Sequence, residues 1–243
     1  MSEPKHSKKI FLTAALCNAQ LQMPMPVFTQ MVIDIATEHA NILDIGYTYM
    51  ISHNAAWVLS RATAQMERFP RFNETFSMTT WIISLNRFYS ERAIRFDDAE
   101  GNVIGWVRTT WVAIDITTRR PVNLLTLFPD GVPMPEMDMP LESLPRIPRL
   151  EQADLSREHT FLASDIDCNR HVNTNRYVEQ IINQWDLDFY DSHSISLFDI
   201  TFHAEALFGE KVTVRHHIDG PDAIAQIENA DGKILTAAHI IFK

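Results

Sequence analysis

The sequence predicts an α+β fold built from two similar halves, in each of which an antiparallel β-sheet wraps one helix. Three observations support this prediction. A segment with helical periodicity stands early in each half and is followed by a series of strand-like segments. Two short sequences recur in the same order in both halves. A proline-rich stretch separates the halves and cannot be a regular helix or a central strand.

The first half opens on an apolar strand-like segment at Ile10, Phe11 and Leu12. Residues 28–43 repeat apolar side chains three and four positions apart, which predicts a helix. The following strands are predicted over residues 56–67, 75–84, 87–97 and 103–116.

The second half repeats this order. A short strand-like segment at residues 159–162 leads into a polar connection at residues 167–173. A helix is predicted over residues 174–185, where Tyr177, Ile181 and Trp185 share one side. The predicted strands cover residues 196–206, 211–218, 223–229 and 234–242.

Two local similarities indicate a duplication. Residues 72–76 (Phe-Asn-Glu-Thr-Phe) resemble residues 208–212 (Phe-Gly-Glu-Lys-Val). Residues 98–104 resemble residues 229–235, and each contains a glycine turn before the last strand of its half. Either pair alone fits generic turns between strands. Because both pairs occur in the same order, duplication is the better interpretation.

The domain boundary is predicted from proline. Residues 129–148 contain six prolines, which remove backbone donors and restrict the residues before them. We therefore expect an N-terminal domain over residues 1–128, a linker over residues 129–155 that crosses a surface, and a C-terminal domain over residues 156–243.

Composition narrows the class of protein. Hydrophobic residues make up 46% and charged residues 21%, as in a globular protein with a core. No apolar run is long enough for a membrane span or a signal peptide, so a cytoplasmic location is expected. Cys17 and Cys168 are expected to be reduced thiols. The seven glycines form no phosphate-binding turn, which excludes the common nucleotide-binding folds.

Charge argues against a nucleic-acid partner. The formal net charge is −10, whereas general nucleic-acid binding needs a basic surface. The acidic excess lies in the linker and the second half, and the first half is almost neutral. An acidic partner would therefore be repelled less by the first half.

The connection before the second helix carries the candidate chemistry. Asp167, Asn169 and His171 stand two residues apart, so in an extended segment their side chains would face one space. Asn173 or Thr174 is placed to cap the helix that follows. The free N–H groups of that helix would stabilise a carbonyl oxygen that gains negative charge. Capping alone would explain Asn173; the whole string points to a catalytic loop.

Residues 167–177, Asp-Cys-Asn-Arg-His-Val-Asn-Thr-Asn-Arg-Tyr, resemble the active-site segment of the acyl-ACP thioesterases of plant plastids and bacteria. The family pattern is Asp-x-Asn-x-His-Val-Asn-Asn-x-Lys-Tyr, from which this chain departs at Thr174 and Arg176. First-half segments also resemble the family and extend the likeness over almost the whole chain: residues 57–61, 86–92, 111–115 and 118–121. The resemblance implies a tandem (double) hotdog fold.

The resemblance also implies a fourth site residue. The family carries a Glu on the strand after the second helix, and Glu205 stands at the matching position. Plant members have a Cys next to it, where this chain has Ala206, so a mechanism that needs that thiol is not available. The implied catalytic residues are Asp167, Asn169, His171 and Glu205, with His203 expected on the same side of the strand as Glu205. Cys168 is a weak alternative nucleophile because it is out of phase with them.

The implied reaction is hydrolysis of fatty acyl-ACP by an activated water, with no cofactor and no metal, as part of fatty acid biosynthesis. The first half would hold the acyl chain, and methionines such as Met23 and Met25 would line the pocket or simply fill the core. Acyl carrier protein is the implied partner, and arginines near the loop would dock it. The alternatives are an acyl-CoA thioesterase, a hydratase or dehydratase, and a non-catalytic acyl-binding protein. Whether a homodimer forms stays open.

Overall fold

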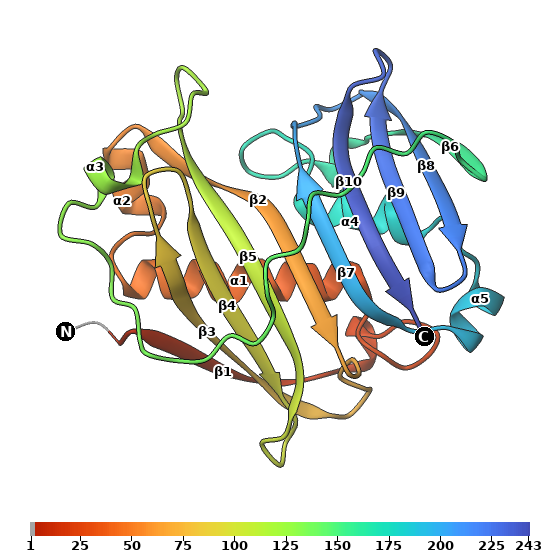
Figure 1. The fold of residues 1–243 in the computed structure, drawn as a ribbon, viewed down its shortest axis with the longest axis horizontal. Helices are drawn as coiled ribbons and strands as arrows, with labels where there is room; N and C mark the ends of the chain where they lie inside the picture. Colours follow the sequence, from red (N-terminus) through yellow and green to blue (C-terminus); the bar gives the residue numbers. More distant parts are fainter. Residues whose placement is uncertain (1–2) are drawn as a thin grey trace.

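The structure, a computed structural model, describes residues 3–243 and contains one antiparallel sheet with helices on one of its faces (Figure 1). The strand order is β1-β3-β4-β5-β2-β7-β10-β9-β8-β6. The first-half strands are β1 (Lys5–Phe11), β2 (Ala55–Met66), β3 (Thr75–Leu85), β4 (Ser90–Asp97) and β5 (Val103–Asp115). The second-half strands are β6 (Leu155–Thr160), β7 (Ile195–Phe202), β8 (Lys211–Asp219), β9 (Asp222–Asn229) and β10 (Ile234–Phe242).

The strand order repeats itself across the middle of the sheet. From its outer edge to the centre, the first half runs β1-β3-β4-β5-β2 and the second half runs β6-β8-β9-β10-β7. Each half thus has its own first strand at the edge and its own second strand at the centre, where β2 pairs with β7. The helices repeat as well: α1 (Met25–Ile42), α2 (Tyr47–Ser52), α4 (Thr174–Ile182) and α5 (Leu187–Ser192). Within residues 3–243, the short helix α3 (Leu124–Leu127) has no counterpart in the second half. The predicted double hotdog is therefore confirmed.

Hydrogen bonds in the turns confirm the two sequence similarities. The N–H of Gly101 donates to Asp98 O at 3.2 Å, and the N–H of Gly232 donates to Asn229 O at 2.9 Å. In the other pair, the Glu74 carboxylate accepts from the Arg71 N–H at 2.8 Å, and its counterpart Glu210 accepts likewise from Leu207 at 3.0 Å. Identical turn chemistry at matching positions supports duplication over chance.

A buried polar layer crosses the core of the first half. Arg92 is only 5% exposed, and its Nη1 donates to His39 Nδ1 at 2.6 Å and to Thr80 Oγ1 at 3.3 Å. Burial lowers the pKa of His39 to about 4, so its imidazole is neutral at pH 7 and accepts this bond. Within residues 3–243, no carboxylate lies within 4 Å of Arg92. Along the chain, His39 stands between Val32, which belongs to one apolar cluster, and Leu43, which belongs to a second.

The seam between the halves is held by a buried ion pair. Asp199 on β7 is 1% exposed and accepts from Arg61 Nε at 2.8 Å and from Arg61 Nη2 at 2.5 Å. Thr63 Oγ1 donates to the same carboxylate at 2.7 Å. Because Arg61 and Thr63 lie on β2 and Asp199 lies on β7, these side-chain hydrogen bonds join the two halves.

Residues 129–154 contain no helix or strand and cross the sheet face opposite the helices (Figure 1). Arg61 donates to the carbonyls of Leu144 at 2.9 Å and Pro145 at 2.7 Å, and Gln226 Nε2 donates to Pro148 O at 3.1 Å. The segment is thus fixed to strands of both halves. The domain boundaries at residues 128 and 156 stay predictions, because the sheet is continuous across them.

Element ends differ from the predictions where turns intervene. The strand predicted from residue 87 begins at Ser90, because Asn86 N–H donates to Tyr89 O and closes a turn. The strand predicted over residues 196–206 ends at Phe202. Helices α2, α3 and α5 are too short to show periodicity and were not predicted.

Candidate active site

The loop from Ile166 to Val172 is a closed turn, so the prediction of an extended segment is wrong. Ile166 and Val172 form an antiparallel bridge. The Asp167 N–H donates to His171 O at 2.8 Å, and Arg170 adopts a left-handed φ of 66°. A reversal of the chain within five residues excludes the alternation of side chains that an extended strand would give.

The Asp167 carboxylate causes the turn. Its Oδ1 accepts from the backbone N–H of Asn169 at 2.8 Å and from that of His171 at 3.2 Å. The Asn169 side-chain amide lies 3.5 Å from Oδ2. Asp side chains stabilise tight turns in this way. Asp167 therefore fixes the backbone of both Asn169 and His171.

Helix α4 starts directly behind the loop. Asn173 is its N-cap, and its side chain accepts from the Asn175 N–H at 3.3 Å. Within residues 3–243, the N–H of Thr174 has no hydrogen-bond acceptor. The positive end of the helix dipole therefore lies beside the loop with one N–H available.

Glu205 lies three residues beyond the end of β7, in a segment held from both sides. Its neighbour Ala206 accepts from the Val172 N–H at 2.9 Å, which ties this segment to the loop. The Ala206 N–H donates to Tyr177 Oη at 2.7 Å, which ties it to α4. Burial raises the pKa of Tyr177, so its hydroxyl stays protonated. These two backbone bonds of Ala206 fix the position of the adjacent Glu205.

Replacing Tyr177 with Phe tests this anchor. The Ala206 N–H is buried and would lose its acceptor, which costs about 1–3 kcal/mol. We expect the free energy of unfolding to fall by this amount in urea titrations, and any activity that depends on Glu205 to fall with it as Glu205 becomes mobile. Tyr190→Phe is the matched control, because its hydroxyl donates to Ile182 O away from the site. Equal activity of the two variants would contradict the anchor.

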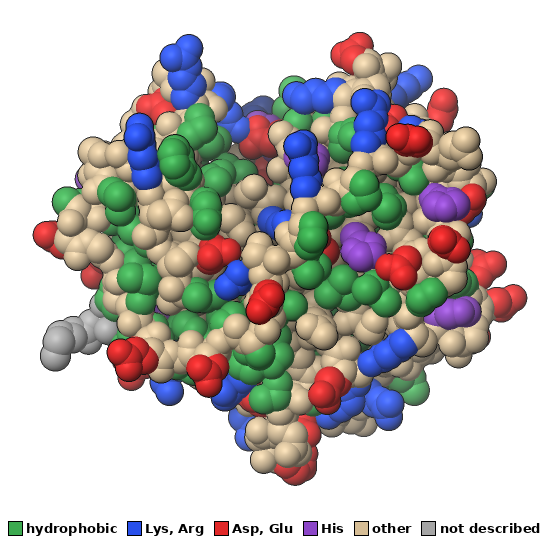
Figure 2. All heavy atoms as spheres, viewed as in Figure 1, with side chains coloured by type: hydrophobic (Ala, Val, Ile, Leu, Met, Phe, Trp, Pro, Cys, Tyr) green, Lys and Arg blue, Asp and Glu red, His purple; other side chains and the backbone are tan. Residues whose placement is uncertain are grey.

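The structure brings His171 and Glu205 together. His171 Nε2 lies 3.4 Å from Glu205 Oε2, and the two side chains are 26% and 41% exposed. The Arg119 guanidinium, from the loop after β5 in the first half, contacts the same oxygen. These groups lie at the upper end of the sheet, and Figure 2 shows the surface hollowed there between the halves, with charged and histidine side chains around the hollow.

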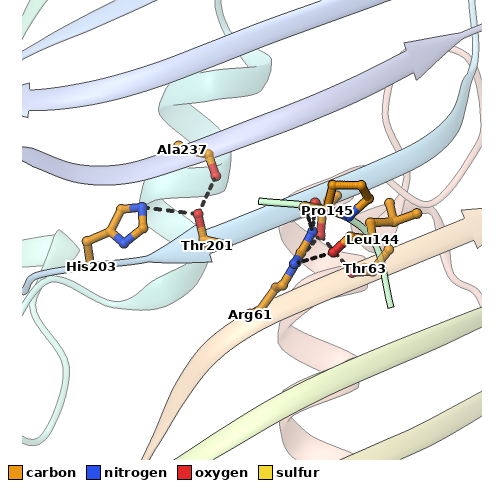
Figure 3. Close-up of polar contacts among 8 residues, drawn as sticks. Arg61, Thr63, Leu144, Pro145, Thr201, His203 and Ala237 are labelled. Atoms are coloured by element: carbon orange, nitrogen blue, oxygen red, sulfur yellow. Dashed lines mark hydrogen bonds and ion pairs between the residues drawn. The ribbon is translucent and has the colours of Figure 1, made fainter. Parts of the chain in front are cut away.

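Two further residues considered for the site, His203 and Cys168, do not contact His171 or Glu205 among residues 3–243. His203 points to Thr201, with Nε2 3.2 Å from Oγ1, and lines a cavity of about 300 Å³ together with Arg61 (Figure 3). The expectation that His203 and Glu205 share a side is wrong, because β7 ends before them. Cys168 is a free, exposed thiol, and within residues 3–243 its sulfur makes no hydrogen bond to a base.

The first half contains a matching turn without the acid and the imidazole. Gln22 N–H donates to Asn18 Oδ1 at 3.0 Å, Asn18 N–H donates to Gln22 O at 2.8 Å, and Leu21 has a φ of 55°. Asn18, Gln20 and Gln22 thus occupy the places of Asp167, Asn169 and His171. Phe69 occupies the place of Glu205, because the next residue accepts the matching backbone bond from Met23. The second half therefore contains the acid and the imidazole of the candidate site, and the matching turn of the first half does not.

Sequence reasoning missed two residues that act on the site. Arg119 belongs to a family-like segment, but no local signal places it against a residue 86 positions later. The helical spacing of Tyr177 puts it on the apolar side of α4 and does not reveal the partner of its hydroxyl.

The described residues contain no group of three His, Cys, Asp or Glu side chains that could hold a metal ion. Among the same residues, no helix is both long enough and apolar enough to cross a membrane.

Comparisons with known proteins support the sequence resemblance. Residues 5–128 match the acyl-ACP thioesterase N-terminal domain, and residues 150–243 match the acyl-ACP thioesterase C-terminal domain. An oleoyl-acyl carrier protein thioesterase 2 of Arabidopsis thaliana is 26% identical over 163 residues, 61% of this chain and 44% of the relative. The chain thus matches less than half the length of this plant relative.

Solved structures share the fold. An acyl-ACP thioesterase from Bacteroides thetaiotaomicron superposes with a TM-score of 0.89 at 24% identity, covering 99% of this chain and 98% of the other. A 12:0-ACP thioesterase from Umbellularia californica gives a TM-score of 0.85 at 17% identity, covering 100% and 98%.

Proposed function

Because the chain belongs to the acyl-ACP thioesterase family, we propose that it hydrolyses the thioester of fatty acyl-ACP and releases a free fatty acid. The observation that carries this proposal is the contact of His171 with Glu205 at 3.4 Å, beside the free N-terminus of α4. A carboxylate, an imidazole and a helix N-terminus supply a base and a site for developing negative charge. Asp167, Asn169, His171 and Glu205 are the proposed catalytic residues.

Glu205 serves as the general base in the proposed reaction. It takes a proton from a water whose oxygen attacks the thioester carbonyl. His171 orients the water and the carboxylate for this transfer. The electron pair of the carbonyl moves onto its oxygen. When the tetrahedral intermediate collapses, the carbon–sulfur bond breaks, and the proton passes to the departing thiolate. Neither thiol of the chain takes part.

The developing oxyanion needs donors that are already in place. The Asn169 side-chain amide and the Thr174 N–H are the proposed donors, since Asp167 fixes the loop that carries Asn169. Loss of one such donor costs about 3–4 kcal/mol in the transition state.

The proposed acyl site lies in the first half, between α1 and the sheet. A narrow apolar gap of about 10 Å³ is lined there by Met25, Phe28, Val32, Ala62, Ala64 and Val107, with Phe198 and Ile200 from the second half. This gap is too small for an acyl chain, so α1 or its flexible side chains must move when the chain enters. The polar layer of His39 and Arg92 lies beyond it and would repel a longer chain.

Enlarging one side chain of the gap tests this assignment. We expect Ala64→Phe to shift the released fatty acids toward shorter chains, lowering the ratio of long to short products by roughly tenfold or more, since one methylene in an apolar pocket is worth about 10–200-fold. Mass spectrometry of acids released from an acyl-ACP panel measures the shift. Ala225→Phe, buried in the second half, should leave the chain-length profile unchanged. An unaltered profile in Ala64→Phe places the acyl chain elsewhere.

The proposed partner is acyl carrier protein, in fatty acid biosynthesis and in the cytoplasm. Arg170 is exposed on the loop that borders the site, and its guanidinium group suits an acidic, phosphate-bearing partner. Because exposed charges are screened, added salt should reduce kcat/KM on acyl-ACP.

Side-by-side hydrolysis of acyl-ACP and acyl-CoA, followed as thiol release, tests the proposed substrate. Preference for acyl-ACP supports the proposal, and preference for acyl-CoA makes the protein a CoA thioesterase on the same fold. Absence of thiol release from both would leave an acyl-binding protein.

A further inference from the structure

Arg119 joins the two halves at the Glu205 carboxylate. It belongs to the loop after β5 in the first half, and its Nη2 contacts Glu205 Oε2 in the second half. His171 Nε2 approaches the same oxygen at 3.4 Å. Both contacts are to Oε2, and within residues 3–243 no hydrogen-bond or ion-pair partner contacts Oε1 of Glu205. Both neighbours therefore hold one carboxylate oxygen and leave the other for a reacting water.

The loop that carries Arg119 is built with backbone strain. Arg119 has a φ of 60°, a left-handed conformation that is unfavourable for a residue with a side chain. Asp115 holds the loop in place: its carboxylate accepts from the N–H groups of Thr117 at 3.0 Å and Thr118 at 2.6 Å, and its carbonyl accepts from the Arg119 N–H at 2.8 Å. Hydrogen bonds from Thr118 lower the pKa of Asp115, so these contacts persist at neutral pH.

Stability does not account for this arrangement. The Arg119 and Glu205 side chains are 44% and 41% exposed, and ion pairs this exposed contribute little to the stability of a fold. The strain of the loop works against that small gain. Strained residues cluster at functional sites, where their geometry serves the reaction.

Within residues 3–243, the contact between Arg119 and Glu205 lies beside His171 and has no equivalent at the matching place in the first half. At the matching place in the first half, Phe69 stands instead of Glu205, and amides stand in the turn. The contact therefore accompanies the candidate catalytic groups rather than the fold.

We propose that Arg119 is a positioning residue for the reaction: its guanidinium holds Glu205 Oε2 toward His171, so that Oε1 faces the water that attacks the thioester. This inference rests on the proposed hydrolysis at this site. Arg119 exchanges no proton itself, and the site is incomplete without the first half.

The test compares Arg119→Ala with Arg120→Ala, a neighbouring exposed arginine for which residues 3–243 supply no ion pair. We expect Arg119→Ala to lower kcat on acyl-ACP about 10–100-fold, as supporting residues behind a reactive group typically do. The KM should stay within about threefold, since the guanidinium acts on the base and not on the carrier. Low millimolar guanidinium chloride should restore part of the lost kcat in Arg119→Ala and change nothing in Arg120→Ala or the unsubstituted protein.

Several results would overturn the proposal. An unchanged kcat in Arg119→Ala rejects it, as does a loss confined to KM, which would assign Arg119 to carrier binding. Failure of guanidinium to rescue a folded Arg119→Ala protein also rejects it. A further loss of kcat when Arg119→Ala is added to Glu205→Gln would show that the two act separately. If the unsubstituted protein releases no thiol from acyl-ACP, the proposed hydrolysis itself is rejected. That outcome differs from the results above, all of which require an active unsubstituted protein.

Discussion

Glu205→Gln should lower kcat for acyl-ACP hydrolysis by about 10²–10⁴-fold, the range that a positioned general base contributes. The amide keeps the size of the side chain and cannot take a proton from water. Because Glu205 is 41% exposed and lies in a segment that its neighbour Ala206 holds, the fold should be unaffected. Thiol release under saturating acyl-ACP measures the loss.

Glu158→Gln is the matched control, since Glu158 is an exposed carboxylate on β6 and faces no candidate catalytic group. It should retain full activity. Activity of Glu205→Gln within threefold of the control, with both proteins folded by circular dichroism, would remove Glu205 from the proposed chemistry.

Arg61→Met should lower the free energy of unfolding by about 3–5 kcal/mol, because it leaves a carboxylate buried without its cation. Asp199 is 1% exposed and would keep only the Thr63 hydroxyl as a side-chain donor. The carbonyls of Leu144 and Pro145 would lose their donor in the same step, which frees part of the segment that crosses the sheet. Both losses fall on the seam between β2 and β7.

Urea unfolding monitored by tryptophan fluorescence measures this effect. Arg157→Met removes an exposed guanidinium that donates to Asn183 O, and it should change stability by less than about 1 kcal/mol. If the two variants unfold at the same urea concentration, the buried pair does not hold the seam.

The duplicated fold could be predicted because each half repeats its local chemistry. The glycine turns at Gly101 and Gly232 need left-handed backbone, and sequence shows such positions directly. The periodicity of α1 likewise reflects burial on one side, so its extent was predicted within a few residues. These features depend on neighbours in the sequence.

The candidate site could be predicted only in part, because its geometry depends on residues far apart in the chain. Asp167 was expected to act within an extended segment, and instead its carboxylate folds the loop back on itself. The side chain of Arg119 reaches Glu205 only because β2 and β7 pair and place the halves side by side. No periodicity encodes that contact. The strand alternation assumed for His203 failed for a related reason, since β7 ends one residue before it.

The central claim is direct attack of water on the thioester at Glu205. A single turnover of acyl-ACP by excess protein in water enriched with oxygen-18 tests it, with mass spectrometry of both the fatty acid and the peptide that contains Glu205. Direct attack predicts one heavy oxygen in the released acid and none in Glu205. Heavy oxygen in the Glu205 carboxylate, with unlabelled acid released, would show that the carboxylate itself attacks the carbonyl and would contradict the proposed role of water.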